Sequence, residues 1–141
     1  MRVFRNILYV ILCILGGFLA LSAFAGGVGL LFNLNTPPVE QLGDSVFKNF
    51  VVPGLALFFL VGGGAVLALI LLIRKSKYAL LFATASGIII MFFEFVEVQV
   101  IGSPAGVART LQIFYFGLGT LITIFAIGVW FMDLRFGLGK A

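Results

Sequence analysis

Two glutamates, Glu94 and Glu97, are the residues of this chain whose type and position could do chemistry. They stand three residues apart inside a long apolar run, so on a helix both point to one side. A carboxylate inside a bilayer is expensive, and such residues normally face a polar partner or a water-filled cavity. The pair therefore predicts either a polar clasp between helices or a site that binds a cation or exchanges a proton.

The partners of these acids are predicted from the geometry of a helical hairpin. At 1.5 Å per helical residue, Glu94 lies about 10 Å and Glu97 about 6 Å from the end of its helix. Counting back from the short loop that follows places Glu97 near Arg109 and Glu94 near Tyr115. Two acids this close should not both stay ionised without a cation. The candidate intramembrane polar site comprises six residues: Glu94, Glu97, Gln99, Arg109, Gln112 and Tyr115.

The residue types that most enzymes and metal sites need are scarce. The chain has no histidine and a single cysteine, Cys13. This removes the commonest general base and metal ligand, and a disulfide framework with it. Two carboxylates supply few of the six to eight oxygens that Ca²⁺ prefers. We therefore expect no metal site, no cofactor and no enzymatic activity.

The acids must be positioned by membrane helices. Apolar residues make up 62% of the chain and charged residues 10%, against roughly 25% charged in a soluble domain. Each of the four apolar runs is long enough to cross a hydrocarbon core of about 30 Å. The runs are residues 6–32, 51–73, 78–101 and 111–132. The predicted fold is all-α, a single transmembrane domain over residues 1–141 that forms an antiparallel four-helix bundle.

The basic residues fall at alternate connections between these runs. Seven of the nine lie before the first run, between the second and third, or after the fourth. The other two connections hold only Lys48 and Arg109. This alternation is the positive-inside pattern, and it predicts a bacterial inner (plasma) membrane protein with both termini in the cytoplasm. The positive charge is thus a topology signal, and we expect no nucleic-acid partner.

Small residues recur at steps of three and four along the predicted helices. Such stripes let helix backbones approach closely in a bilayer, where apolar burial does not drive association. Gly62-Gly63-Gly64 in the second run is compatible with a hinge or with a close contact to a neighbouring helix. The predicted helix-packing residues are Gly16, Ala20, Ala23, Gly27, Ala83, Gly87 and Gly119.

Residues 33–50 form the longest connection. Thr36-Pro37 is typical of a helix start, and Val39, Leu42, Val46 and Phe50 recur at helical spacing. The pattern predicts a short amphipathic helix that lies in the membrane interface between the first two runs. It would serve as an anchor or as a lid.

The N-terminal run has a second interpretation. Arg2 and Arg5, an apolar stretch and Ala23-Phe24-Ala25 resemble a secretory signal with its cleavage site. The apolar stretch is longer than a usual signal core of about 7–15 residues, which favours a membrane span. Cleavage of residues 1–25 stays open as the alternative.

Two stretches carry a resemblance to a protein group. Residues 50–55 (FVVPGL) and 112–117 (QIFYFG), together with the acids of the third run, resemble segments of small four-span bacterial membrane proteins of unassigned activity. The resemblance implies the fold and supplies no activity.

Three hypotheses of function are kept, although the scarce residue types weigh against the enzymatic part of the third. The first is a structural or accessory subunit that packs against itself or a membrane partner. The second is a small ion- or proton-coupled transporter or channel that uses Glu94 and Glu97. The third is an intramembrane enzyme or a lipid- or quinone-binding protein, with an aromatic cleft near Phe92, Phe93, Phe95, Phe114, Tyr115 and Phe116.

Overall fold

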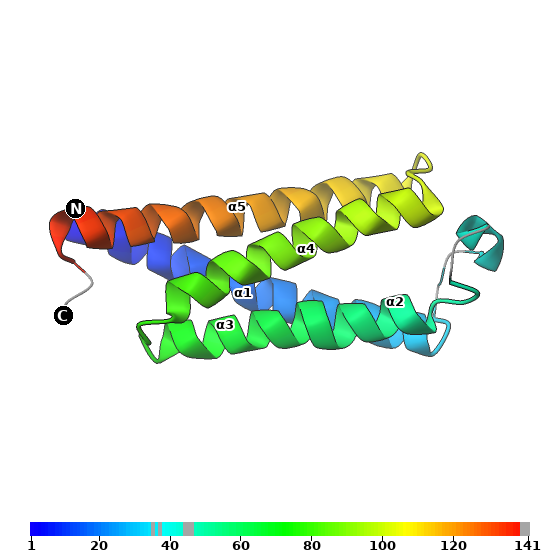
Figure 1. Ribbon diagram of the computed structural model, residues 1–141, viewed down its shortest axis with the longest axis horizontal. Helices are drawn as coiled ribbons and strands as arrows, with labels where there is room; N and C mark the ends of the chain where they lie inside the picture. Colours follow the sequence, from blue (N-terminus) through cyan, green and yellow to red (C-terminus); the bar gives the residue numbers. More distant parts are fainter. Residues whose placement is uncertain (35, 37, 44–46, 139–141) are drawn as a thin grey trace.

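The computed structural model describes residues 1–34, 36, 38–43 and 47–138, and within these ranges every regular element is helical. Three helices make one continuous rod over residues 51–73, because each begins where the previous one ends. The elements in chain order are α1 (Arg2–Leu31), the 3-10 helix η1 (Val39–Leu42), α2 (Val51–Leu55), the π-helix η2 (Ala56–Gly62), α3 (Gly63–Ile73), α4 (Ala79–Ile101) and α5 (Val107–Phe136) (Figure 1).

Four helical segments are long and apolar enough to cross a membrane: α1, the rod of α2, η2 and α3, α4, and α5. The prediction of an all-helical chain with four long apolar helices is therefore confirmed. The rod has the predicted bounds, and α4 begins one residue later than expected. α1 begins four residues before its predicted run and ends one residue before the end of that run, and α5 extends the predicted run by four residues at each end.

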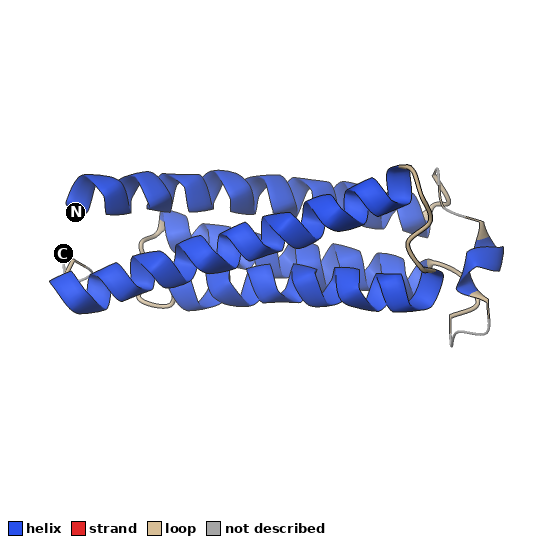
Figure 2. Ribbon diagram, turned by 90° about the horizontal axis from the view of Figure 1, so that it is seen from above, coloured by secondary structure: helices blue, strands red, loops and turns tan. Residues whose placement is uncertain are grey.

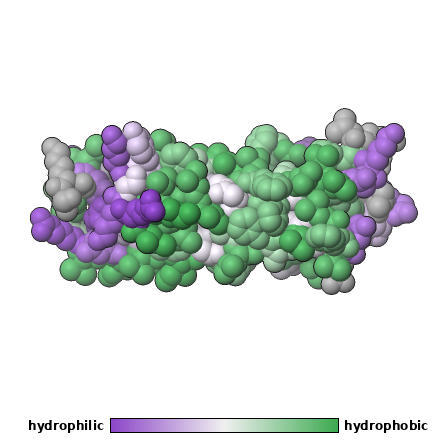
Figure 3. Space-filling view, turned by 90° about the horizontal axis from the view of Figure 1, so that it is seen from below, coloured by the Kyte–Doolittle hydropathy of each residue, from purple (hydrophilic) through white to green (hydrophobic). Residues whose placement is uncertain are grey.

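The helices lie along the long axis of the molecule, and their connections alternate between its two ends (Figures 1 and 2). One end holds both termini and the turn at residues 74–78, and we call it the terminal end. The other holds the connections at residues 32–50 and 102–106, and we call it the loop end. In the view of Figure 3, hydrophilic residues gather at the two ends and the middle is mostly hydrophobic.

The short loop between α4 and α5 is set by two glycines. Gly102 ends α4 with a φ of 74°, and Gly106 precedes α5 with a φ of 111°. Residues with a Cβ rarely adopt these angles, so the two glycines permit the chain to reverse within a few residues. The reversal returns α5 alongside α4, with which it packs along much of its length.

Helix contacts are closest at glycines. A Cβ added to Gly119 of α5 would lie 2.6 Å from the carbonyl oxygen of Gly87 in α4. On the other side of the molecule, a Cβ on Gly27 of α1 would lie 2.7 Å from Cβ of Phe58 in η2. Gly62 contacts the ring of Phe24, so its role is a close helix contact. All seven predicted helix-packing residues are buried.

The connection between α1 and the rod differs from its prediction. The described residues contain a four-residue 3-10 helix, η1, and residues 47–50 are not helical. The predicted short amphipathic helix is thus not seen in the part of the connection that is described, and residues 35, 37 and 44–46 lie outside that part. Leu42 and Phe50, two residues of the predicted apolar face, are buried.

Candidate functional site

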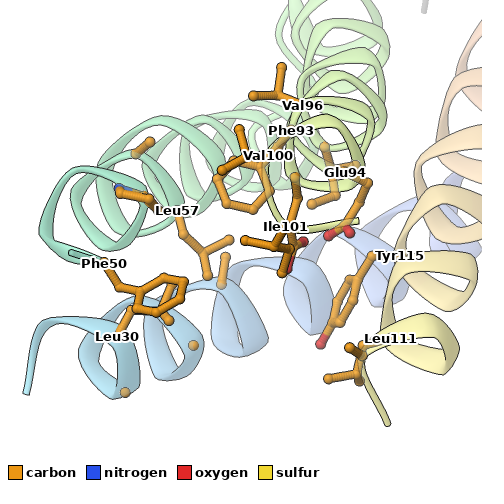
Figure 4. A pocket seen from close by; sticks show the side chains of 18 of the residues that line it. Leu30, Phe50, Leu57, Phe93, Glu94, Val96, Val100, Ile101, Leu111 and Tyr115 are labelled. Carbon is orange, nitrogen blue, oxygen red and sulfur yellow. The ribbon is translucent and has the colours of Figure 1, made fainter. Parts of the chain in front are cut away.

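A cavity of about 910 Å³ lies at the loop end of the molecule. Residues of α1, the 33–50 connection, α2, η2, α4 and α5 form its wall (Figure 4). Figure 1 shows the reason: α4 and the rod lie close together near the terminal end and farther apart at the loop end. Its volume falls within the range of about 300–1,000 Å³ that is typical of small-molecule sites.

The wall of the cavity is almost entirely apolar. Leu19 of α1 and Ile90 of α4 are fully buried and line its inner part. Toward the loop end it is lined by Leu42 and Phe50 from the connection. The polar side chains among its described wall residues are Ser22, Thr36, Glu94, Glu97 and Tyr115.

The mouth of the cavity is apolar as well. Several wall residues are also exposed on the outside of the molecule, so they must lie at its edge. On α4 these include Ile88 and Phe92, on the rod Val52 and Leu60, and on α5 Val107 and Leu111. Between α4 and the rod, which are neighbouring helices, the edge of the cavity is therefore apolar. An opening with an apolar edge suits hydrocarbon better than water.

Glu94 lies inside this apolar space. Its side chain is 5% exposed, and its Oε2 atom is buried without a hydrogen-bond partner among the described residues. Glu97, one turn further along α4, also lines the cavity, and the two carboxyl groups interact with each other. Buried polar atoms are normally hydrogen-bonded, so an unpaired carboxyl oxygen in a cavity is a place for a ligand donor.

The predicted ion pair between Glu97 and Arg109 does not form. The guanidinium of Arg109 donates to the carbonyl oxygen of Ser103, with an Nε–O distance of 3.0 Å, and the side chain is exposed. Arg109 begins α5 next to the loop, so the nearest acceptor is a loop carbonyl six residues back. In the described ranges, the one ion pair joins Arg5 to Asp133 at the terminal end.

The other predicted site residues divide between the cavity and its surroundings. Tyr115 lines the cavity on α5, and in Figure 4 its hydroxyl points away from Glu94. Gln112 is buried but donates to the carbonyl oxygen of Gly102 at 3.0 Å, which ties α5 to the loop. Gln99 is exposed. The structure thus brings Glu94, Glu97 and Tyr115 together, and it leaves the amides and Arg109 outside.

A polar cluster at the terminal end was missed by the sequence interpretation. Arg5 of α1 forms two hydrogen bonds with Asp133 of α5, and its guanidinium lies 5.3 Å from the ring centre of Tyr9. The Tyr9 hydroxyl donates to the carbonyl oxygen of Leu72 near the end of α3 at 2.8 Å. The cluster joins three helices. The feature of the sequence that could have revealed the cluster is Asp133, an acid at the terminal end, where most of the basic residues lie.

A metal site is not favoured by this arrangement. Within the described ranges, no group of three histidine, cysteine, aspartate or glutamate side chains gathers in one place. The cavity has a mostly apolar wall that also carries two carboxyl groups and a phenol. It can hold an apolar molecule and fix one polar group of it.

Comparisons with protein-family profiles, with curated proteins and with solved structures found no match for this chain. The function is consequently inferred from the geometry of the cavity and of the terminal-end cluster.

Proposed function

We propose that this chain is an integral membrane protein that binds a lipophilic ligand in the cavity at its loop end. Its four long helices cross the bilayer as an antiparallel bundle, with both termini and the turn at residues 74–78 in the cytoplasm. The membrane is a bacterial inner membrane, and the loop end lies at its outer face. Glu94 and Glu97 hold the polar group of the ligand.

The observation that carries this proposal is the combination of an apolar mouth with a buried carboxyl pair. A molecule that enters between α4 and the rod passes the side chains of Leu60 and Phe92, which favour hydrocarbon. Inside, it meets the unpaired carboxyl oxygen of Glu94. Ligand sites commonly combine an apolar lining with a few placed polar groups that fix orientation.

This proposal ranks above the accessory-subunit hypothesis for one reason. A subunit that only packs against a partner gains nothing from acids in an apolar cavity, because each buried polar atom without a partner costs stability. A binding site explains the same acids, since the ligand completes their hydrogen bonds. The enzymatic hypothesis lacks a nucleophile paired with a base near the cavity in the described residues.

Native mass spectrometry of the gently extracted protein tests the proposal. Wild-type protein should retain a stoichiometric small ligand or lipid. Ala56→Phe places a ring in the cavity wall and should remove the bound mass, because the ring takes up space that the ligand needs. Ala85→Phe is the matched control, since Ala85 is a half-buried alanine of α4 outside the cavity wall. Equal retention by all three proteins would place the ligand elsewhere.

Transport is a second candidate, favoured by the difference between the two ends of the molecule. The cavity lies at the loop end, while Arg5, Asp133 and Tyr9 join three helices at the terminal end. A site open to one side and closed to the other is what an alternating-access cycle requires in one of its states.

Transport has its own test in reconstituted vesicles. Glu94→Gln and Glu97→Gln should abolish movement of the ligand, or of protons coupled to it, without lowering the melting temperature of the bundle. Normal flux in both variants would rule transport out and leave binding as the function.

A further inference from the structure

We propose that the ligand of the loop-end cavity is a cationic amphiphile, a protonated amine on a hydrocarbon chain. This inference rests on the proposed function and names the chemical class that the site selects. It follows from the charges of the wall, the unpaired acceptor and the aromatic rings beside it.

The ionisable groups that line the cavity can carry charge of only one sign. Among the described wall residues the ionisable groups are Glu94, Glu97 and the phenol of Tyr115, and none is basic. Arg109, the nearest basic residue expected at this site, is bonded to a loop carbonyl and exposed. An apolar site strengthens any charge interaction inside it, so a negative head group would be repelled and a positive one attracted.

The unpaired atom in the cavity is an acceptor. Glu94 is at least nine-tenths buried, and its Oε2 lacks a donor among the described residues. In Figure 4 its carboxyl group points into the space bounded by α1, α4 and α5. An ammonium group carries donors and a charge, and a hydrogen bond between charged groups is stronger than one between neutral groups. An alcohol supplies the donor without the charge.

The aromatic residues of the wall support the same head group. Phe93 lines the cavity from α4, the helix that carries Glu94, and Tyr115 lines it from α5 (Figure 4). The faces of aromatic rings attract cations, and sites that recognise quaternary ammonium groups are built from such rings. Most of the other wall residues are apolar, Leu57 and Leu60 of η2 among them, and they suit an alkyl chain.

The experiment compares three probes that share a dodecyl chain and differ in the head group: dodecylammonium, dodecanol and dodecanoate. Binding to the full chain in lipid nanodiscs is measured by equilibrium dialysis, with empty nanodiscs subtracted. Dodecylammonium is charged at pH 7, because amines of this kind have a pKa near 10. We expect it to bind about tenfold tighter than dodecanol, and dodecanoate to bind weakest.

Variants of the acidic residues test where the preference for dodecylammonium over dodecanol comes from. Glu94→Gln combined with Glu97→Gln should bind dodecylammonium and dodecanol equally. Glu40→Gln is the matched control, because Glu40 is an exposed acid at the same end of the molecule and outside the cavity wall. It should keep the full preference. The wild-type comparison decides the question even if the double variant does not fold.

The outcomes separate the two proposals. If dodecanol binds the wild type as tightly as dodecylammonium, or if the double variant keeps the preference, the cationic class is wrong and the lipophilic site stands. If none of the three probes binds above the empty nanodiscs, the cavity is not a site for alkyl ligands and both proposals fail.

Discussion

Arg5 and Asp133 clamp the beginning of α1 to the end of α5. The Nε–Oδ1 distance is 2.7 Å and the Nη2–Oδ2 distance is 3.0 Å, so the guanidinium and the carboxylate meet through two parallel hydrogen bonds. Both side chains are largely buried, at 21% and 14% exposed. Together with the bond from Tyr9 to Leu72, this pair closes the terminal end of the molecule, while the loop end opens around Glu94.

The clamp should stabilise the fold. Asp133→Asn and Arg5→Gln should each lower the free energy of unfolding by about 1–3 kcal/mol. Each substitution removes one charge of the pair and leaves the other charge largely buried without an opposite charge beside it. The double variant should lose less than the sum of the two, which a double-mutant cycle measures. Arg135→Gln, an exposed residue of the same helix end, is the control and should have little effect. Additive losses would show that the pair contributes no coupling.

The approach of α4 to α5 at Gly87 and Gly119 should not tolerate a methyl group. In Gly119→Ala the new Cβ would meet the Gly87 carbonyl oxygen, which belongs to the backbone and cannot swing aside. We expect a loss of about 1–3 kcal/mol, measured by thermal unfolding in detergent. Gly117→Ala, two residues earlier on α5, has no atom within 4 Å of the added Cβ and should fold normally. Similar melting temperatures would mean that the helices do not pack at this contact.

A second close contact, between a glycine of α1 and a phenylalanine of the π-helix η2, can be tested in the same way. Gly27 lies against the backbone of Phe58, and its added Cβ would be 3.0 Å from Phe58 Cα. Gly27→Ala should push η2 away from α1, alter the cavity beside Leu57 and weaken ligand binding. Gly16→Ala is the control, because nothing lies within 4 Å of its added Cβ although Gly16 is buried. Unchanged binding in Gly27→Ala would show that this contact does not shape the site.

Arg109 should be dispensable for the site. Its side chain bonds to Ser103 rather than to the acids, so Arg109→Gln should leave the preference for dodecylammonium over dodecanol unchanged. A cation that neutralised Glu97 in solution would give the opposite result, since its removal would strengthen binding of the amine. The nanodisc dialysis described above provides the measurement.

The orientation in the membrane can be tested without altering any charge. Cysteines replace Ala105 at the loop end and Phe136 at the terminal end, both exposed, in a background where Cys13 is changed to alanine. A membrane-impermeant thiol reagent applied to intact cells should label Ala105→Cys alone. After permeabilisation it should label both. Labelling of Phe136→Cys in intact cells would reverse the proposed topology.

The sequence predicted the helices well because hydropathy over a window of residues is a local property. Residues 51–73 and 79–101 agree with prediction to within a residue, and Glu94 is buried, as are the predicted packing residues Ala83 and Gly87 of the same helix. The partners of the acids were not predictable in the same way. Whether Arg109 turns to Glu97 or to Ser103 depends on the loop path, which the glycine φ angles set and the composition does not encode.

The cavity and the π-helix could not be predicted from the sequence, for a related reason. A cavity forms where neighbouring helices diverge, and divergence depends on how tightly they are held at the other end. Here α4 packs against α3 near the terminal end, and it diverges from η2 and α2 toward the loop end (Figure 1). The apolar stretch around Leu57 has the same hydropathy whether it faces a partner helix, lipid or a ligand, so hydropathy does not distinguish these environments.

Photolabelling in lipid bilayers tests the central claim most directly. A dodecylamine that carries a photoreactive diazirine in its chain is bound to the wild type, irradiated, and located by mass spectrometry of peptides. We predict labels on Leu57 of η2 and Phe93 of α4, which line the cavity and are half-buried. These labels should disappear in Ala56→Phe, while labels on exposed Phe131 remain. Labels confined to exposed residues in the wild type would contradict the account, because the ligand would then touch the protein only as bulk lipid does.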